Sequence, residues 1–261
     1  MRRNFNSSFI SAKDKRASKS GVYGMEKHLL ERMGGNFKSV IHVPASYSNQ
    51  YSVEFDGTND YIAIGTSAID LDTNFTISCW FRSDYHGGYV PIGGWGDFSS
   101  GKLRLMQILG GLSFEIWGNR VTGSTSILTH TWYHAAVTYS GNDAIVYLNG
   151  SQDGSGTIAR TSFSSSTTLI GGHPSLTASG FSEFDGEIDE FVVFNSVLSA
   201  SQIENIYNSG TPDDLSSLSP LGWWRMGDND GGSGTTITDQ GSGGNNGTLT
   251  NGATIVSQVP S

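Results

Sequence analysis

The sequence predicts an all-β protein, an antiparallel two-sheet sandwich that follows a basic N-terminal arm. Apolar residues recur with a period of two from Tyr51 onward, which is typical of strands with one buried face. In residues 74–82, for example, one face holds Phe75, Ile77, Cys79 and Phe81, and the other holds Thr76, Ser78, Trp80 and Arg82. The chain contains 35 Gly but only 15% charged residues, a composition that suits many short strands joined by tight turns.

Residues 1–50 form the first region, which is polar and basic to about Ser20 and compatible with a short helix over 25–33. Nine basic and three acidic residues give this region a net charge of +6, which leaves −15 on the rest of the chain. Such an asymmetry predicts an arm that binds an acidic surface, nucleic acid or a partner subunit, while the body avoids nucleic acid. The arm residues expected to contact a partner are Arg2, Arg3, Lys13, Lys15, Arg16 and Lys19.

Residues 51–261 form the second region, the sandwich. Its further strands are expected at 89–95, 102–109, 112–118, 132–139, 144–150, 167–172 and 187–194. These strands do not alternate with helices, which disfavours a parallel α/β sheet. One short surface helix is expected after Ser199, which with Gln202 makes a capping-box pair, and Gly210 and Pro212 are expected to end it.

Cys79 is the only cysteine, so no disulfide can form within the chain. The first residues offer no apolar stretch of the kind found in secretion signals, and no apolar run reaches membrane-spanning length. We therefore expect neither secretion nor membrane insertion. We expect the protein to be made in the cytoplasm of a host cell.

Four segments carry a family resemblance: VEFDGTNDYIAI (53–64), FTISCWFR (75–82), TWYHAAVTYSGNDAIVYLNG (131–150) and FDGEIDEFVVFNSVLSASQI (184–203). In this order they resemble the laminin-G-like, concanavalin A-like jelly roll over residues 51–208. Residues 222–253 look like the segment that more often precedes the FDG strand in such domains. Residues 222–256 are therefore expected to supply permuted closing strands, and a truncated second copy is the alternative.

The strand FDGEIDEF raises the question of catalysis. Glucanases of the same fold class, as the resemblance implies, carry alternate carboxylates on such a strand. Here Glu187 and Asp189 lie on one face of the strand. The third carboxylate of that pattern would stand at Phe191, or at Val192 in a variant one residue longer, and neither residue is acidic. A retaining glycosidase needs two carboxyl groups about 5 Å apart. We therefore expect no enzymatic activity.

A structural calcium ion fits the acidic residues better, and the resemblance implies such a site in many relatives. Asp60 and Asp189 are the main candidate ligands, with Asp56 and Asn59 as weaker ones, because Ca²⁺ collects carboxylate and carbonyl oxygens. Alternatively, Asp56 and Asp60 only cap a turn. The six histidines show no zinc spacing.

Two loops, 84–101 and 171–184, are the candidates for glycan binding. They place aromatic and polar residues near turns: Tyr85, His86, Trp95, Asp97, Phe98, His173 and Phe181. The alternative is that Trp95 and Phe98 cover the end of the core.

A jelly roll with a basic arm and one cysteine resembles virion proteins of tailed bacteriophages. The expected function is a non-enzymatic virion structural protein, a capsid decoration, head fibre or tail adhesin, attached by its arm to capsid or tail proteins. A cell-surface glycan and further copies of the chain are expected partners. A carbohydrate-binding lectin and a degenerate glycoside hydrolase are the alternatives, because fold does not fix function.

Overall fold

The computed structural model of the chain describes residues 47–64, 71, 74–85, 87–96, 103–159, 167–172 and 183–261. Residue contacts divide the chain into residues 1–46 and 47–261, so residues 47–50, expected to belong to the arm, pack with the body. The predicted helix at 25–33 and all six arm residues named above lie outside the described residues. No helix in the described part is long and apolar enough to cross a membrane.

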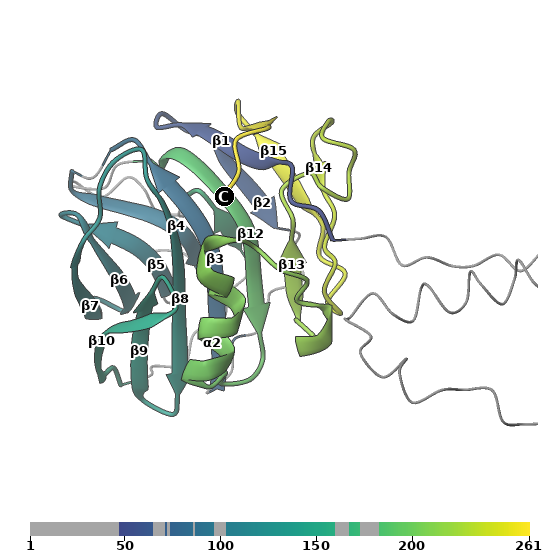
Figure 1. Cartoon of the computed structure of the whole chain (residues 1–261). Helices are drawn as coiled ribbons and strands as arrows, with labels where there is room; N and C mark the ends of the chain where they lie inside the picture. The colour runs from purple at the N-terminus through teal and green to yellow at the C-terminus, as the bar shows by residue number, and fades with distance from the viewer. Residues whose placement is uncertain are drawn as a thin grey trace, which may run out of the picture. The chain divides into compact units, whose positions relative to one another are not determined.

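Two antiparallel sheets form the sandwich, as predicted (Figure 1). Sheet A has the order β10-β9-β8-β3-β12-β1-β16, with β13 also paired to β12, and sheet B has the order β14-β15-β2-β11-β4-β5-β6-β7. The strands are β1 (Ser52–Asp56), β2 (Tyr61–Ile64), β3 (Asn74–Ser83), β4 (Tyr89–Trp95), β5 (Leu103–Ile108), β6 (Gly111–Ile116), β7 (Asn119–Ser126), β8 (Trp132–Ser140), β9 (Asp143–Leu148), β10 (Ser151–Thr157), β11 (Thr168–Ile170), β12 (Asp185–Phe194), β13 (Gly222–Trp224), β14 (Thr236–Ile237), β15 (Gly247–Thr250) and β16 (Thr254–Val256).

Aromatic side chains from both sheets fill the space between them. Phe75 of sheet A lies 6.0 Å from Phe114 of sheet B, measured between ring centroids. Phe191 of β12 lies 6.1 Å from Trp95 of β4. Gly93 is required beside this pair, because a Cβ at that position would approach Phe191 Cζ to 2.8 Å. Large rings of this kind bury much apolar area and dominate core stability.

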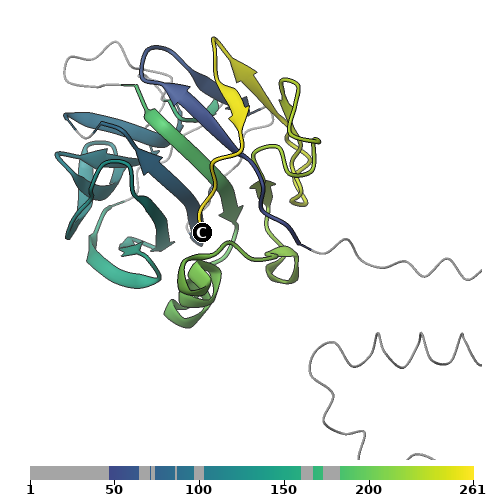
Figure 2. The same cartoon turned by 45° about the horizontal axis from the view of Figure 1, so that its top comes forward.

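The chain's last strands lie at the sheet edges. Strand β16 pairs with β1, so the yellow C-terminal strand runs beside the purple first strand (Figure 2). Strands β14 and β15 extend sheet B next to β2. Segments far apart in the sequence therefore close both sheets within this one chain.

Helix α2 (Ala200–Tyr207) covers part of the outer face of sheet A (Figure 1). Its start is as predicted: Ser199 and Gln202 form a capping box. It ends earlier than predicted, because Asn208 takes the left-handed conformation and 3₁₀ turns follow at Asn208–Gly210 and Ser216–Leu218. Ile203 and Ile206 pack into a second apolar cluster on this outer face, together with Val192, Phe194 and Trp223.

Candidate functional site

Three loops at one end of the sandwich carry large aromatic or aliphatic side chains that are exposed to solvent. The ring of Tyr85, after β3, is 45% exposed, and Leu109 and Leu128 are 81% and 63% exposed. Backbone hydrogen bonds hold the loops together, since Leu109 N donates to Gly88 O and Ile127 N to Gly110 O. We call the group of Asp84, Tyr85, Leu109, Leu128 and His130 the loop-end surface.

The Tyr85 ring lies against the backbone at Gly87. Its phenol lies so close to Gly87 that any Cβ there would overlap the ring. Ser83 Oγ donates a hydrogen bond of 2.5 Å to the Tyr85 carbonyl. The exposed ring therefore packs against the Gly87 backbone, and the hydrogen bond from Ser83 fixes the backbone that carries it.

Charged side chains next to Tyr85 in the chain and on neighbouring strands pair with one another. Arg82 NH1 lies 2.7 Å from Glu187 Oε2 and 3.0 Å from Asp84 Oδ1. His130 Nδ1 lies 2.7 Å from the same Asp84 oxygen. His130 also has a positive φ of 56°, which is uncommon for residues other than glycine and costs backbone energy. The loop-end surface thus combines an exposed aromatic ring with polar groups that are already hydrogen-bonded.

Further carboxylates lie along the same end. Asp84 N donates to Asp185 O at 2.8 Å, which brings the start of β12 beside the loop-end surface. Burial, Asp84 and Asp56 together raise the pKa of Asp185. Burial and the charge of Asp60 raise the pKa of Glu183 to about 7. These shifts follow from burial and from like charges placed near one another.

A second polar cluster is buried on the outer face of sheet A. Strand β12 contains a bulge between Asp189 and Val192, and Glu190 there has a positive φ of 46°. Glu190 accepts hydrogen bonds from Tyr47 Oη, Trp223 Nε1 and Arg225 Nε, at 3.1, 2.6 and 3.0 Å. Burial raises its pKa to about 7, although Arg225 opposes the shift.

The neighbouring Asp189 is completely buried. Asn49 Nδ2 donates to its Oδ2 at 2.8 Å, and Gln50 N donates to Asp228 Oδ1 at 2.9 Å. Burial and the adjacent Glu190 raise the pKa of Asp189 well above its ordinary value. Residues 47–50 therefore cover an acidic pair that alternation along β12 would have placed on opposite faces.

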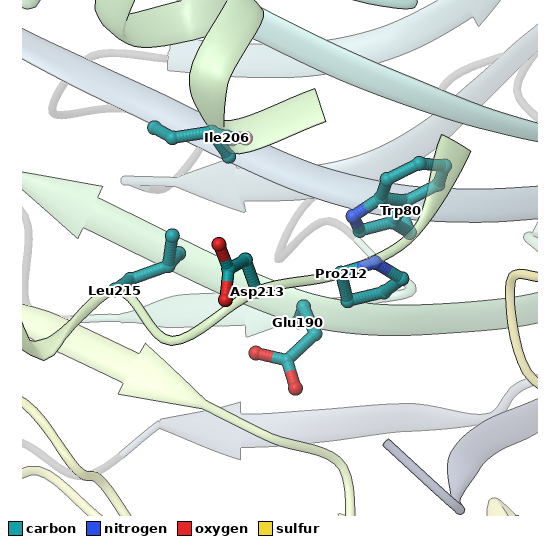
Figure 3. A pocket seen from close by; sticks show the side chains of 7 residues that line it. Trp80, Glu190, Ile206, Pro212, Asp213 and Leu215 are labelled. Carbon is teal, nitrogen blue, oxygen red and sulfur yellow. The ribbon is translucent and has the colours of Figure 1, made fainter. Parts of the chain in front are cut away.

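The pocket beside Glu190 is closed. Figure 3 shows Trp80, Pro212 and Asp213 around Glu190, with Ile206 and Leu215 nearby. It has no space for a water molecule. A more open groove of about 180 Å³ runs between α2 and residues 213–218, but its lining contains no aromatic ring. Neither cavity offers a stacking platform for a sugar.

The structure separates the residues predicted to bind glycans. Tyr85 belongs to the loop-end surface, but Trp95 is wholly buried in the core at the other end of β4, so the interpretation of Trp95 as a binding residue is wrong. A seven-residue strand is about 20 Å long, which keeps the two rings far apart. The other candidates, His86, Asp97, Phe98, His173 and Phe181, lie outside the described residues.

The four predicted calcium ligands do not assemble. Asp189 pairs with Trp80 in the middle of sheet A, whereas Asp56 pairs with Asp185 near the end of β12. Asp56 N donates to Asp60 Oδ2 and Thr58 N donates to Asp56 Oδ1, which fits the turn-capping alternative. Asp60 Oδ1 is buried without a hydrogen-bond partner, the one feature that fits a cation. Among the residues that the structure describes, no three acidic, His or Cys groups could hold a metal ion.

The two carboxylates considered for catalysis are both engaged. Glu187 is paired with Arg82, and Asp189 is buried beneath Asn49. Sequence reasoning missed Asp84, Leu109, Leu128 and His130 because their neighbours come from distant loops. It also missed Glu190 and Arg225. The consecutive acids Asp189 and Glu190 inside an apolar strand could have indicated a buried polar cluster.

Comparisons with known proteins agree with this lectin-like sandwich. A family model described as the concanavalin A-like lectin/glucanases superfamily matches residues 56–204. The chain therefore belongs to this superfamily. No curated protein matches it.

Solved structures share the fold at low sequence identity. A candidate carbohydrate-binding protein from Bacteroides ovatus has a TM-score of 0.62 and 22% identity, over 82% of this chain and 62% of that one. The chain thus spans less than two thirds of that relative. A heptameric pentraxin from Limulus polyphemus has a TM-score of 0.50 and 16% identity, over 61% of this chain and 82% of that one. A module of a Ruminococcus gnavus sialidase, CBM40 bound to α2,3 sialyllactose, has a TM-score of 0.50 and 13% identity, over 62% of this chain and all of that one.

Proposed function

We propose that the protein is a non-enzymatic carbohydrate-binding module whose ligand lies on the loop-end surface. The observation that carries this proposal is the exposed Tyr85 ring, which lies against Gly87 and directly follows Asp84, the hydrogen-bond partner of His130. An amphipathic ring gives a sugar an apolar face to stack on, and a few fixed polar groups orient its hydroxyls. Membership of a lectin/glucanase superfamily supports the same class of ligand.

The non-enzymatic part of the proposal is supported by the positions of the acidic residues. A retaining glycosidase uses two carboxyl groups that flank the substrate bond. Glu187 instead contacts Arg82 at 2.7 Å, and Asp189 has no exposed surface. We expect no release of reducing sugar when the chain is incubated with the oligosaccharides it binds.

The test is a glycan array followed by calorimetry on the full chain and two variants. Tyr85→Ala should reduce affinity at least tenfold, because it removes the stacking ring. Trp117→Ala is the matched control, since this ring is 39% exposed on the turn between β6 and β7, at the opposite end of β6 from Leu109. Equal losses in both variants, or none in Tyr85→Ala, would contradict the assignment of the surface.

A second candidate function is attachment of this module to a virion. Its support is the charge asymmetry of the sequence, with +6 on residues 1–50 and −15 on the remainder. In this proposal the arm binds capsid or tail proteins of a bacteriophage, several copies assemble, and the sandwich faces a host glycan. Imaging of the native assembly should show regular copies on the particle. Replacing Lys13, Lys15, Arg16 and Lys19 by Gln in the full chain should abolish incorporation while glycan binding persists.

A further inference from the structure

The body of the protein is unusually poor in basic residues. Between residues 51 and 261 the chain contains only six lysines and arginines, namely Arg82, Lys102, Arg104, Arg120, Arg160 and Arg225. The structure describes four of them, and Lys102 and Arg160 lie outside the described residues. Whether these four side chains are already paired with acids decides whether the described surface can bind an anionic ligand.

Each described arginine is already paired with a carboxylate. Arg82 NH1 lies 2.7 Å from Glu187 Oε2, and Arg225 Nε lies 3.0 Å from Glu190 Oε1. Arg104 NH1 lies 2.8 Å from Glu115 Oε1, a buried pair across β5 and β6. Proteins recognise carboxylates, sulfates and phosphates mainly through arginine and lysine donors. In the described part of the body these donors are engaged by the protein's own acids.

Arg120 is the most exposed of the four. Its NH2 lies 3.8 Å from Glu115 Oε2, and its guanidinium lies over the Tyr89 ring at 5.2 Å. It extends from β7, one strand beyond the buried Arg104–Glu115 pair. This arginine is therefore held by an acid and by the ring of Tyr89, the first residue of β4.

The loop-end surface itself lies among acids. Asp84 is part of it, its backbone N donates to Asp185 O at 2.8 Å, and Asp56 pairs with Asp185 across β1 and β12. Arg82 is the one arginine or lysine in contact with this surface among the described residues, and both Glu187 and Asp84 bind it. Among the described residues the local charge is therefore negative, and an anionic ligand would meet repulsion there because Arg82 is already paired.

We propose that the loop-end surface binds uncharged saccharides and discriminates against saccharides that carry a carboxylate or a sulfate. This inference rests on the proposed carbohydrate-binding function and specifies the ligand class of the same site. Tyr85 supplies stacking that is independent of ligand charge, while Asp84, Asp185 and Asp56 oppose negative charge. The discrimination should weaken with added salt, because the Debye length falls from about 10 Å at 0.1 M to about 3 Å at 1 M.

The test compares matched sugars on the full chain in a chelating buffer at low salt. The probes are neutral oligosaccharides, each paired with its 3′-sialylated and 3′-sulfated form, for example lactose with 3′-sialyllactose and 3′-sulfolactose. For the neutral sugar that binds, we expect its anionic forms to bind at least tenfold more weakly, with a smaller difference at 1 M salt. Tyr85→Ala should weaken binding of the neutral form and thereby locate the site.

Asp185→Asn provides the charge control. It removes one negative charge beside the loop-end surface without altering Tyr85, so the neutral sugar should bind as before and its sialylated form more tightly. Equal or tighter binding of the anionic forms through Tyr85 would overturn this inference and leave the carbohydrate-binding proposal standing. Absence of binding by every saccharide would overturn both.

Discussion

Among the described residues, Arg225 is the one cation that binds the buried Glu190, and replacing it by methionine removes this partner. The Arg225 Nε lies 3.0 Å from Glu190 Oε1, and the guanidinium lies 4.3 Å from the centre of the Tyr47 ring. Its NH2 group also donates a hydrogen bond of 2.5 Å to Ser48 O. Methionine keeps much of the aliphatic volume but removes the charge and all the donors.

The expected cost depends on pH. Removing one partner of a buried ion pair costs about 3–5 kcal/mol, because the remaining charge is buried and unpaired. Glu190 can avoid this cost by binding a proton, since burial raises its pKa to about 7 even with Arg225 present. We therefore expect Arg225→Met to lower the unfolding free energy by about 3–5 kcal/mol at pH 8 and by much less at pH 5.

The sign of the wild-type pH dependence follows from the same shift. The pKa of Glu190 rises from 4.5 to about 7 on folding, so the folded state binds more protons between these values. The unfolding free energy should therefore fall as the pH rises through this window. Losing Arg225 raises the pKa of Glu190 further and extends the window to higher pH.

Urea unfolding at pH 5 and pH 8 measures both effects. The double variant Arg225→Met/Glu190→Gln serves as the control, because it removes both charges and should recover much of the loss at pH 8. An equal loss at the two pH values, or a double variant no more stable than the single one, would refute the reasoning.

Three other predictions concern the helix, the sheet and calcium. Ser199→Ala should lower the unfolding free energy by about 1 kcal/mol in urea titrations, since it removes the capping box of α2. Gly186→Ala should prevent recovery of folded protein in circular dichroism, because its φ is 128° and a Cβ would overlap the Arg82 carbonyl. Gly110→Ala, at a positive φ but in open space, should remain folded, and a folded Gly186→Ala would contradict the close contact. Asp189→Asn should leave any calcium-induced change in melting temperature as large as in the wild type, because Asp189 lies apart from Asp60. Loss of that change in Asp189→Asn, measured by scanning fluorimetry in EGTA and in calcium, would restore Asp189 as a ligand.

Local patterns in the sequence predicted the elements well. The period-two run at 74–82 becomes β3, with Phe75 and Ile77 in the core, and Ser199 begins the helix as its capping box requires. These features depend on residues two to four positions apart, and their cause is local backbone geometry and side-chain alternation.

The same alternation misjudged the second face of β3. Alternation predicted one buried face for this strand, but Thr76, Ser78 and Trp80 on the other face are buried as well. Helix α2 covers this face, where Tyr207 lies 5.7 Å from Trp80 between ring centroids. No pattern within β3 encodes this cover, because it comes from a helix more than a hundred residues later.

The sequence likewise predicted only part of the candidate site. An aromatic residue next to a turn marked Tyr85 as a surface ring, and that feature is readable from the sequence. The same feature also marked Trp95, which fills the core, because loop residues and core residues at strand ends look alike until the opposite sheet is in place. Leu109, Leu128 and His130 join Tyr85 only through hydrogen bonds between three separate loops.

The amino-acid order alone therefore determined most of the strands, though not β7 and β10, together with the short helix, the all-β class and the charge contrast between arm and body. Each of these depends on composition or on near neighbours. Tertiary structure decided which acids are paired, which rings are exposed and where Glu190 meets Arg225. Burial and electrostatic pairing are properties of spatial neighbours, and in this sandwich most of those neighbours are distant in the chain.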